Sequence, residues 1–233
     1  MRILAIILTV FLATPVLAEA TVAQVTVVGE GKSETAPDMA TISLGVLSQG
    51  KTAAEVMRQN NAAVANVLEE IRSGGVAARD MQTSGLSLSP VWDNRSSISG
   101  EERIKGFQAS NMVTVRVRDL DRLGEILDRV VGAGANRFNG LQFGVQKIQP
   151  LADAARQAAV KDAMRKAELY AQAAGVRLGR VLTISENGGG AMPRPEMMRS
   201  AAAMDGMSVP LAEGEVSVRA SVTMVFALSA NEQ

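Results

Sequence analysis

Few side chains in this protein could carry out catalysis or hold a metal. The 233 residues include no histidine and no cysteine. Without imidazole or thiolate there can be no serine–histidine or cysteine–histidine nucleophile pair, no histidine general base, no zinc site of ordinary composition and no redox-active cysteine pair. Chemistry could rest only on carboxylates, lysines or serines. The sequence therefore predicts no catalytic residue, no cofactor and no metal site, and it favours a protein that is not an enzyme.

Two patterns resemble known sites without meeting their requirements. Gly31-Lys32-Ser33 looks like the end of a phosphate-binding loop. That loop needs a glycine five residues before Gly31, where Thr26 stands, and a helix afterwards, which Pro37 prevents. Glu101 and Glu102 are adjacent acids that point to opposite faces of an extended segment, so they make a poor acid/base pair. They are more typical of a solvated charge run.

The pair of glycines at 29 and 31 is a third pattern of this kind. It lacks the third glycine of a dinucleotide-binding fingerprint and lies between strands that look antiparallel. We expect a turn or a β-bulge there instead.

A segment over residues 187–210 is rich in glycine, proline, alanine and methionine, and it is predicted to be a long, flexible loop. Its methionines are Met192, Met197, Met198, Met204 and Met207. Thioethers are soft ligands that suit Cu(I), and exposed methionine oxidises reversibly to the sulfoxide. A loop of low specificity or an interaction surface explains the composition without either property. Copper binding stays an alternative.

The first residues are typical of an export signal. Arg2 supplies positive charge, residues 3–13 are apolar apart from Thr9, and Pro15 precedes a small-residue cleavage site. Cleavage after Ala18 fits best, and a cut after Ala20 is the alternative. The apolar run is shorter than the roughly 20 residues of a membrane-spanning helix. We therefore expect a signal peptide over residues 1–18 and a periplasmic mature chain over 19–233 with no stable membrane insertion; secretion beyond the periplasm is the lesser option.

Composition narrows the choice of partners. The chain carries 24 basic and 24 acidic residues, and aromatic residues make up 3% of it. There is neither a basic footprint nor a stacking platform for nucleic acid. The lack of cysteine suits an oxidising compartment and excludes disulfides, so the mature chain must be held together by burial of apolar side chains.

Strand and helix signals alternate along the chain. Residues 24–28 and 39–46 read as a hairpin, and a helix follows in which Thr52 and Glu55 form a capping box and Gly74 and Gly75 mark the end. Residues 86–91 and 111–117 then read as two strands, before a helix capped by Asp119. The order suggests two hairpin-then-helix units, which ordinary alternation of strands and helices explains equally well.

The remainder of the chain departs from that order. Residues 141–146 read as a short strand, and Pro150 begins a long alanine-rich helix that ends at Gly175. Its predicted stripe consists of Ala159, Ala163, Ala167, Tyr170 and Ala174. The alanines in this stripe are small enough for close packing on a sheet or another helix. An Asp162 and Lys166 pair on this helix is interpreted as a solvated contact. Residues 180–185 and 215–228 read as the final strand pair.

Three runs of residues together carry a family resemblance. They are Val27-Val28-Gly29-Glu30-Gly31 with Ala36-Pro37-Asp38-Met39-Ala40-Thr41-Ile42 and Gly45-Val46, then Ile104-Lys105-Gly106-Phe107-Gln108-Ala109-Ser110-Asn111 with Val115-Arg116-Val117-Arg118-Asp119-Leu120, then Ala158, Asp162, Ala163, Lys166 and Ala167 before Gly175. In order and spacing they resemble the SIMPL (DUF541) family, which includes bacterial periplasmic immunogenic proteins and oxidative-stress defence proteins. The resemblance covers the mature chain and brings no catalytic residues with it.

The resemblance and the strand pattern together set our expectations. The fold class is α+β and SIMPL-like, with largely antiparallel sheets built from ββα units and about three helices, in a single domain over residues 19–233. Residues 222–228 are apolar on both faces and need cover on each side. Because the family is associated with homo-oligomers, we expect self-assembly beyond a dimer. The expected function is a non-enzymatic, self-assembling scaffold in envelope or oxidative stress tolerance; a ligand- or Cu(I)-binding protein is the alternative.

Overall fold

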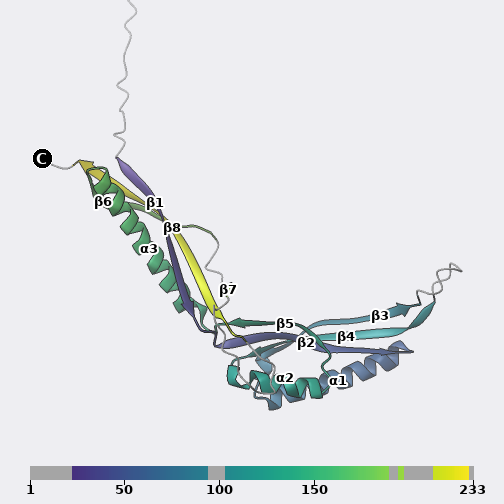
Figure 1. The fold of residues 1–233 in the computed structure, drawn as a ribbon. Helices are drawn as coiled ribbons and strands as arrows, with labels where there is room; N and C mark the ends of the chain where they lie inside the picture. The colour runs from purple at the N-terminus through teal and green to yellow at the C-terminus, as the bar shows by residue number, and fades with distance from the viewer. Residues whose placement is uncertain (1–22, 94–102, 189–193, 197–211, 231–233) are drawn as a thin grey trace, which may run out of the picture.

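The computed structural model describes residues 23–93, 103–188, 194–196 and 212–230. Within them the protein is an elongated, bent molecule with two arms, each a sheet covered on one face by helices (Figure 1). The fold is α+β with antiparallel pairing throughout the described strands, which confirms the predicted class. No helix in the described part of the chain is both long and apolar enough to cross a membrane.

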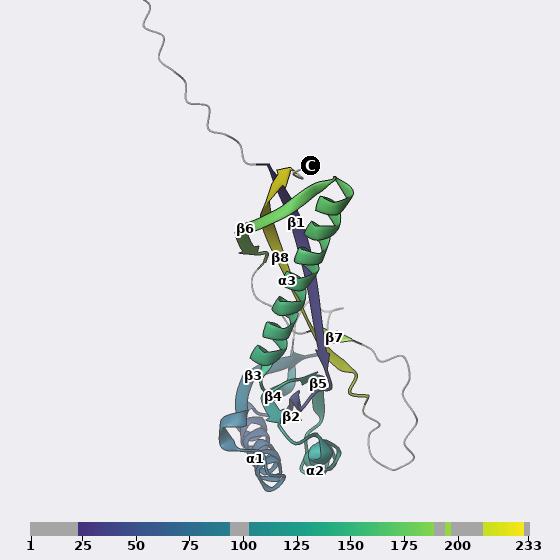
Figure 2. The same cartoon turned by 90° about the vertical axis from the view of Figure 1, so that its left-hand side faces the viewer.

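The first arm combines the two ends of the described chain. Its sheet has the order β1-β8-β6, and a short strand β7 pairs with the start of β8. The bounds are Gln24–Thr35 for β1, Val176–Glu186 for β6, Arg194–Glu196 for β7 and Glu215–Ala230 for β8. Helix α3, Ile148–Ala173, lies along one face of this sheet (Figure 2). Its core combines the inward side chains of β8, from Val218 to Phe226, with the alanines of α3.

Alanine on the helix and glycine on the strand let α3 lie close to β1. The buried stripe of α3 consists of Ala152, Ala155, Ala159, Ala163, Ala167 and Ala171. A Cβ atom added at Gly29 would lie 2.1 Å from the carbonyl oxygen of Ala159. One added at Gly31 would lie 2.0 Å from that of Ala155. Both glycines are therefore in the middle of a strand, and the expected turn or bulge was wrong.

The second arm holds the other sheet, in the order β3-β4-β2-β5. The bounds are Met39–Gly50 for β2, Met81–Trp92 for β3, Ile104–Val117 for β4 and Arg137–Gly144 for β5. Helices α1, Ala53–Ser73, and α2, Leu123–Gly132, cover one face (Figure 1). Two single-turn 3₁₀ helices, Ala78–Asp80 and Leu120–Arg122, precede β3 and α2. A second core, separate from the first, is built from β2, β4 and the two helices, with Leu44, Ile71 and Leu123 fully buried.

One buried polar side chain joins α1 to this sheet. The Asn60 amide donates to the carbonyl oxygens of Val46 on β2, at 2.9 Å, and Ala109 on β4, at 3.3 Å. Asn60 itself is fully buried. Its Oδ1 atom is buried without a hydrogen-bond partner among the described residues, so the NH2 group alone joins the helix to the two strands.

The arms meet where β1 gives way to β2. Asp38 lies between these strands, and its carboxylate accepts from the backbone N–H of Gln146 at 2.6 Å. The Gln146 side chain donates back to the Asp38 carbonyl oxygen at 3.0 Å and accepts from Arg118 at 3.2 Å. The junction is thus held by contacts among the β1–β2 link, the end of β4 and the segment before α3.

The predicted first hairpin was wrong. β1 pairs with β8, and β2 pairs with β4 and β5, so the two consecutive strands belong to different sheets. The predicted second hairpin is confirmed as β3 with β4. Local turn chemistry around Pro37 signals a chain reversal but does not say which strand becomes the neighbour.

Three local predictions need correction and one is confirmed. Thr52 caps α1, its hydroxyl accepting from the N–H of Glu55 at 3.3 Å, and Gly74 follows the helix, as predicted. Asp119 makes no side-chain capping bond in the described chain, because a 3₁₀ turn separates it from α2. α3 begins at Ile148, ahead of Pro150. Tyr170 is 54% exposed, because the stripe of α3 continues through Ala171.

Candidate functional site

The most exposed strand is β3, at the edge of the second sheet. Every residue from Gln82 to Pro90 is exposed. Leu86 and Leu88 oppose Asn111 and Ala109 of β4, which are buried on the helix-covered side. Because directly opposed residues share a face of the sheet, both leucines point to the side of α1 but beyond its cover. Leu86 is 58% exposed and Leu88 is 44% exposed.

Trp92 and Ile104 extend this apolar surface toward the tip of the β3–β4 hairpin. They are paired across the two strands, after a register shift, and are 46% and 51% exposed. We call Leu86, Leu88, Trp92 and Ile104 the β3 apolar surface. Exposed apolar side chains gathered on an edge strand are typical of an interaction surface.

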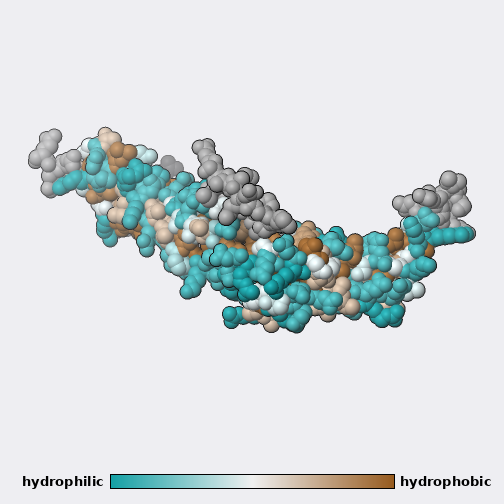
Figure 3. Space-filling view, turned by 60° about the horizontal axis from the view of Figure 1, so that its bottom comes forward, coloured by the Kyte–Doolittle hydropathy of each residue, from teal (hydrophilic) through white to brown (hydrophobic). Residues whose placement is uncertain are grey.

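The other arm has a smaller counterpart on β6. Val181, Leu182 and Ile184 are 38%, 36% and 56% exposed. Val181 and Ile184 oppose Phe226 and Met224, which are buried against α3, yet both remain exposed on this edge strand. Apolar residues are visible on the surface of the arm that contains α1 and α2, and on the other arm near the end that lies away from the junction (Figure 3). Both arms therefore expose apolar side chains on an edge strand.

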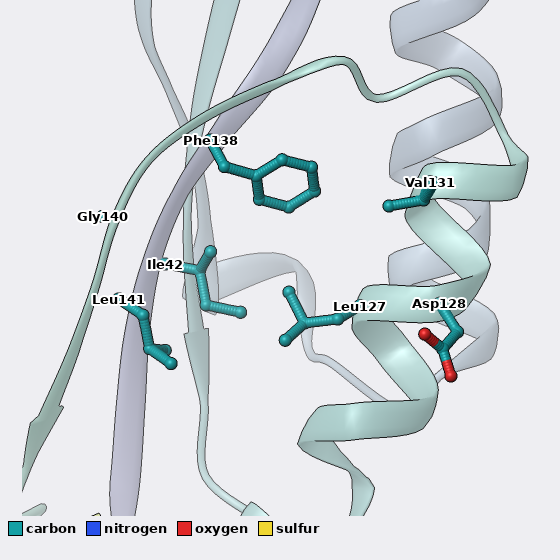
Figure 4. Close-up of a pocket in the computed structure, with 7 residues that line it drawn as sticks. All are labelled: Ile42, Leu127, Asp128, Val131, Phe138, Gly140 and Leu141. Carbon is teal, nitrogen blue, oxygen red and sulfur yellow. The ribbon is translucent and has the colours of Figure 1, made fainter. Parts of the chain in front are cut away.

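An open pocket of about 400 Å³ lies between α2 and β5. Leu127 and Val131 of α2 point toward Phe138 and Ile42 across it (Figure 4). A register shift in β5 leaves Asn139 unpaired, which brings Phe138 and Leu141 to the same face. The lining is almost entirely apolar. Such a pocket could hold an apolar ligand, although it offers few polar groups to orient one.

A cluster of charged side chains surrounds Asp80, just before β3. Asp80 has a buried carboxylate that accepts from Arg118 through Nε at 2.8 Å and Nη2 at 2.7 Å. These hydrogen bonds hold the pKa of the Asp80 carboxyl below its usual value, against the opposing effect of burial. The same bonds raise the pKa of the Arg118 guanidinium. Arg116 and Arg79 lie farther from the carboxylate, at 3.7 and 3.9 Å.

A second charged cluster ties α3 to β1. The Asp162 carboxylate contacts Lys166 and Arg165 at 2.6 Å each, and it accepts from the backbone N–H of Glu30 at 3.1 Å. Lys166 also donates to the carbonyl oxygen of Val28 at 2.8 Å. Lys166, the Glu30 N–H and Arg165, in that order of strength, lower the pKa of the Asp162 carboxyl. This pair therefore joins two elements and is more than the solvated contact predicted.

The remaining candidates of the sequence fall in two groups. Glu101, Glu102 and the five loop methionines lie outside the described residues. Gly31-Lys32-Ser33 is part of β1, in keeping with its rejection as a phosphate loop. Among the described residues, no three acidic side chains come close enough together to hold a metal ion.

Comparison with known proteins identifies the family. Residues 25–226 match SIMPL, described as a protein of unknown function (DUF541). The chain belongs to the SIMPL family. This SIMPL chain is 40% identical over 211 residues to the 26 kDa periplasmic immunogenic protein of Brucella melitensis, covering 88% of this chain and 84% of that protein.

Two further relatives are named as uncharacterized protein YggE. The one from Edwardsiella ictaluri is 31% identical over 175 residues, covering 75% of this chain and 72% of the relative. The one from Escherichia coli K12 is 27% identical over 207 residues, covering 88% and 83%. The names of these three relatives indicate no enzymatic activity.

Sequence reasoning missed the β3 apolar surface and the arginines around Asp80. The β3 apolar surface has a signal in the sequence, because residues 86–92 carry apolar side chains at every second position. What the pattern does not contain is how far α1 reaches along the sheet. Arg79 precedes Asp80 in the sequence, and Arg116 and Arg118 lie two positions apart. Only the packing of β4 beside the turn before β3 brings the three arginines together around Asp80.

Proposed function

We propose that this SIMPL protein is a non-enzymatic periplasmic scaffold that assembles with copies of itself and contributes to envelope or oxidative stress tolerance. The observation that carries the proposal is the exposure of β3 along nearly its whole length, with Leu86, Leu88 and Trp92 on one face. An isolated strand edge of this kind invites pairing with another chain.

The rest of the molecule supports assembly. Ile184 exposes a second apolar edge on the other arm, so that one copy presents two separate surfaces. Two surfaces on different arms allow each copy to contact two neighbours, which favours a closed ring or a larger symmetric assembly. The alanine stripe of α3 is covered by its own sheet, so it is not a further surface for another chain.

The cellular part of the proposal draws on relatives and composition. The Brucella relative is named as periplasmic, and the start of this chain is typical of an export signal. The lack of histidine and cysteine removes most catalytic chemistry, which leaves binding and assembly as the simplest mode of action. The stress role follows the family resemblance alone.

Charge substitutions on β3 test the assembly. In the variant Leu86→Asp/Leu88→Asp, an apolar interface would have to bury two carboxylates, which costs several kcal/mol per contact. Sedimentation of the mature wild-type protein at micromolar concentration should show a homo-oligomer larger than a dimer, little affected by moderate salt. The variant should be at least about 100-fold weaker in assembly.

The matched control places the same charges on the other face of the same strand, as Ser87→Asp/Ser89→Asp. It should keep the wild-type size. A monomeric wild-type protein would refute self-assembly, and equal loss in both variants would refute the assigned face. The stress role is tested by oxidant survival of a strain that lacks the chain, complemented with either variant. Rescue by the assembly-deficient variant would refute a scaffold role.

A ligand-binding role is the second candidate, and the apolar pocket between α2 and β5 favours it. The change Val131→Asp would place a charge in its mouth and should abolish the fluorescence of an apolar dye if the dye binds there. Cu(I) titration of the wild-type protein against a variant without residues 187–210 tests the methionine loop. Equal copper binding by the two proteins would remove that loop from consideration.

A further inference from the structure

Four arginines face one open pocket at the junction of the arms. The pocket has a volume of about 250 Å³ and lies between the end of α1, the turn before β3 and the end of β4. Its charged lining consists of Arg79, Arg116, Arg118 and Arg122 with the carboxylates of Asp80 and Asp119. The lining therefore carries two more positive than negative charges. It stays net positive when Asp38, which acts on Arg118, is also counted.

Asp80 forms hydrogen bonds with only one of these arginines, Arg118. Both of its carboxylate oxygens accept from Arg118, in a two-pronged arrangement. Arg116 and Arg79 approach no nearer than 3.7 and 3.9 Å, which is beyond hydrogen-bond length. Asp80 thus serves to hold Arg118 in place, while the N–H groups of Arg116 and Arg79 remain available to a ligand.

The environment of Arg122 gives the strongest evidence for a ligand in this pocket. The residue is half-buried, and its backbone N–H donates to the Asp119 carbonyl oxygen at 3.3 Å, but its guanidinium forms no ion pair or hydrogen bond with the described residues. Its Nη1 atom lies 2.3 Å from the place that a Cβ atom at residue 75 would take. Gly75 has a φ of +89°, so this position favours glycine for its backbone and glycine also leaves room for the guanidinium. A guanidinium that is partly removed from water and has five donors without acceptors favours an anion beside it.

We propose that this pocket binds a phosphate group, as inorganic phosphate or as the phosphate of a larger molecule. A phosphate dianion matches the excess of two positive charges in the lining. Guanidinium groups bind phosphate oxygens through paired N–H donors, which is why arginine prevails at such sites. The volume equals that of about eight water molecules, enough for a phosphate and part of what is attached to it. The site uses no residue of the β3 apolar surface, so the inference is independent of self-assembly.

Calorimetric titration of the mature protein with inorganic phosphate, at constant ionic strength set with sodium chloride, tests the proposal. The wild-type protein should bind one phosphate per chain. The variants Arg122→Gln and Arg116→Gln should each weaken binding by at least about tenfold, since each removes charged donors to the anion. Arg118 is left intact, because its loss would leave the buried Asp80 carboxylate unpaired.

The matched control is Arg72→Gln, which removes an exposed arginine near the end of α1 and outside the pocket lining. It should bind phosphate as the wild-type protein does. Thermal unfolding checks that each variant is folded, and Arg122→Lys, which keeps the charge without the fork, should bind with intermediate affinity. No saturable binding at millimolar phosphate would overturn the proposal, as would equal weakening by the control.

Two further titrations identify the source of the phosphate. Glycerol phosphate represents a soluble monoester, and vesicles of phosphatidylglycerol in neutral lipid represent a membrane headgroup. Tighter binding of the monoester with no vesicle binding assigns a soluble ligand. Vesicle binding that is lost in Arg122→Gln but kept in Arg72→Gln assigns the headgroup. Vesicle binding that persists in Arg122→Gln would contradict a role of this pocket at the membrane.

Discussion

Replacing Gly29 by alanine should separate α3 from the first sheet. The added Cβ atom would lie 2.1 Å from the carbonyl oxygen of Ala159 and 2.6 Å from the backbone nitrogen of Ala163. Ordinary non-bonded contact needs about 3.5 Å, so the helix would have to retreat by about 1.4 Å at this point. Both obstacles are helix backbone, and a change of rotamer cannot relieve them.

The cost can be worked out from the contact that is lost. A gap of 0.5–1 Å already forfeits about a quarter to a half of the dispersion energy of the atoms concerned. Overpacking in a filled core costs about 1–3 kcal/mol, and the backbone clash places Gly29→Ala at the upper end of that range. Alanine in place of glycine also stabilises the strand by about 0.5–1 kcal/mol, which offsets part of this cost, because glycine is unfavourable within a strand. The net loss of about 2–2.5 kcal/mol corresponds to a fall in Tm of about 4–10 °C for a chain of this length.

The assay is thermal unfolding followed by circular dichroism, at equal protein concentration because assembly shifts apparent stability. Hydrogen exchange should show the loss of protection in α3 and β1, with α1 unchanged, because the two cores are separate. The control is Gly132→Ala at the end of α2, where an added Cβ meets nothing within 4 Å. It should be neutral or slightly stabilising. A Gly29→Ala protein as stable as this control would refute the close packing of α3 on β1.

Three further predictions concern buried polarity, acid stability and processing. Asn60→Ala should lower the free energy of unfolding by about 1–3 kcal/mol in urea titrations, because buried strand carbonyls lose their donor, whereas the exposed neighbour change Asn61→Ala should not. The pKa of Asp162 is lower in the folded protein than in the unfolded chain, so its stabilising effect is present above about pH 4 and is lost as the pH falls further. Asp162→Asn should therefore flatten the decline in stability between about pH 4 and pH 2; an unchanged acid profile would contradict this assignment. Intact mass of the exported protein should give Glu19 as its first residue, or Thr21 for the later cut, and retention of the signal would disprove cleavage.

Local sequence patterns predicted most of the helices and strands of this SIMPL protein. The cap at Thr52 and the stop at Gly74 depend on neighbours a few positions away, and both are confirmed. The alanines of the third helix predicted close packing on a sheet or a helix, and that too is confirmed. The strand predicted over residues 215–228 is likewise observed, as β8 over Glu215–Ala230.

The candidate sites could be predicted only in part. The absence of histidine and cysteine is a property of composition and needs no fold. The grouping of Arg122 with Arg116 and Asp80 could not be foreseen, because it joins the start of α2, the end of β4 and the turn before β3. Charged residues near one another in sequence are common, and nothing local says which of them will share a pocket.

The sequence by itself determined the fold class, the family and the absence of histidine and cysteine. The fold class follows from the alternation of strand and helix signals, the family from the order and spacing of three runs of residues, and the last from composition. The tertiary structure decided that β1 leaves its sequence neighbour to pair with β8, some 190 residues later. It also decided that the glycines of β1 admit a helix, and that α1 stops short of β3 and leaves its leucines exposed. These outcomes depend on which surfaces meet and how far they extend, and they are fixed by long-range packing that no local pattern encodes.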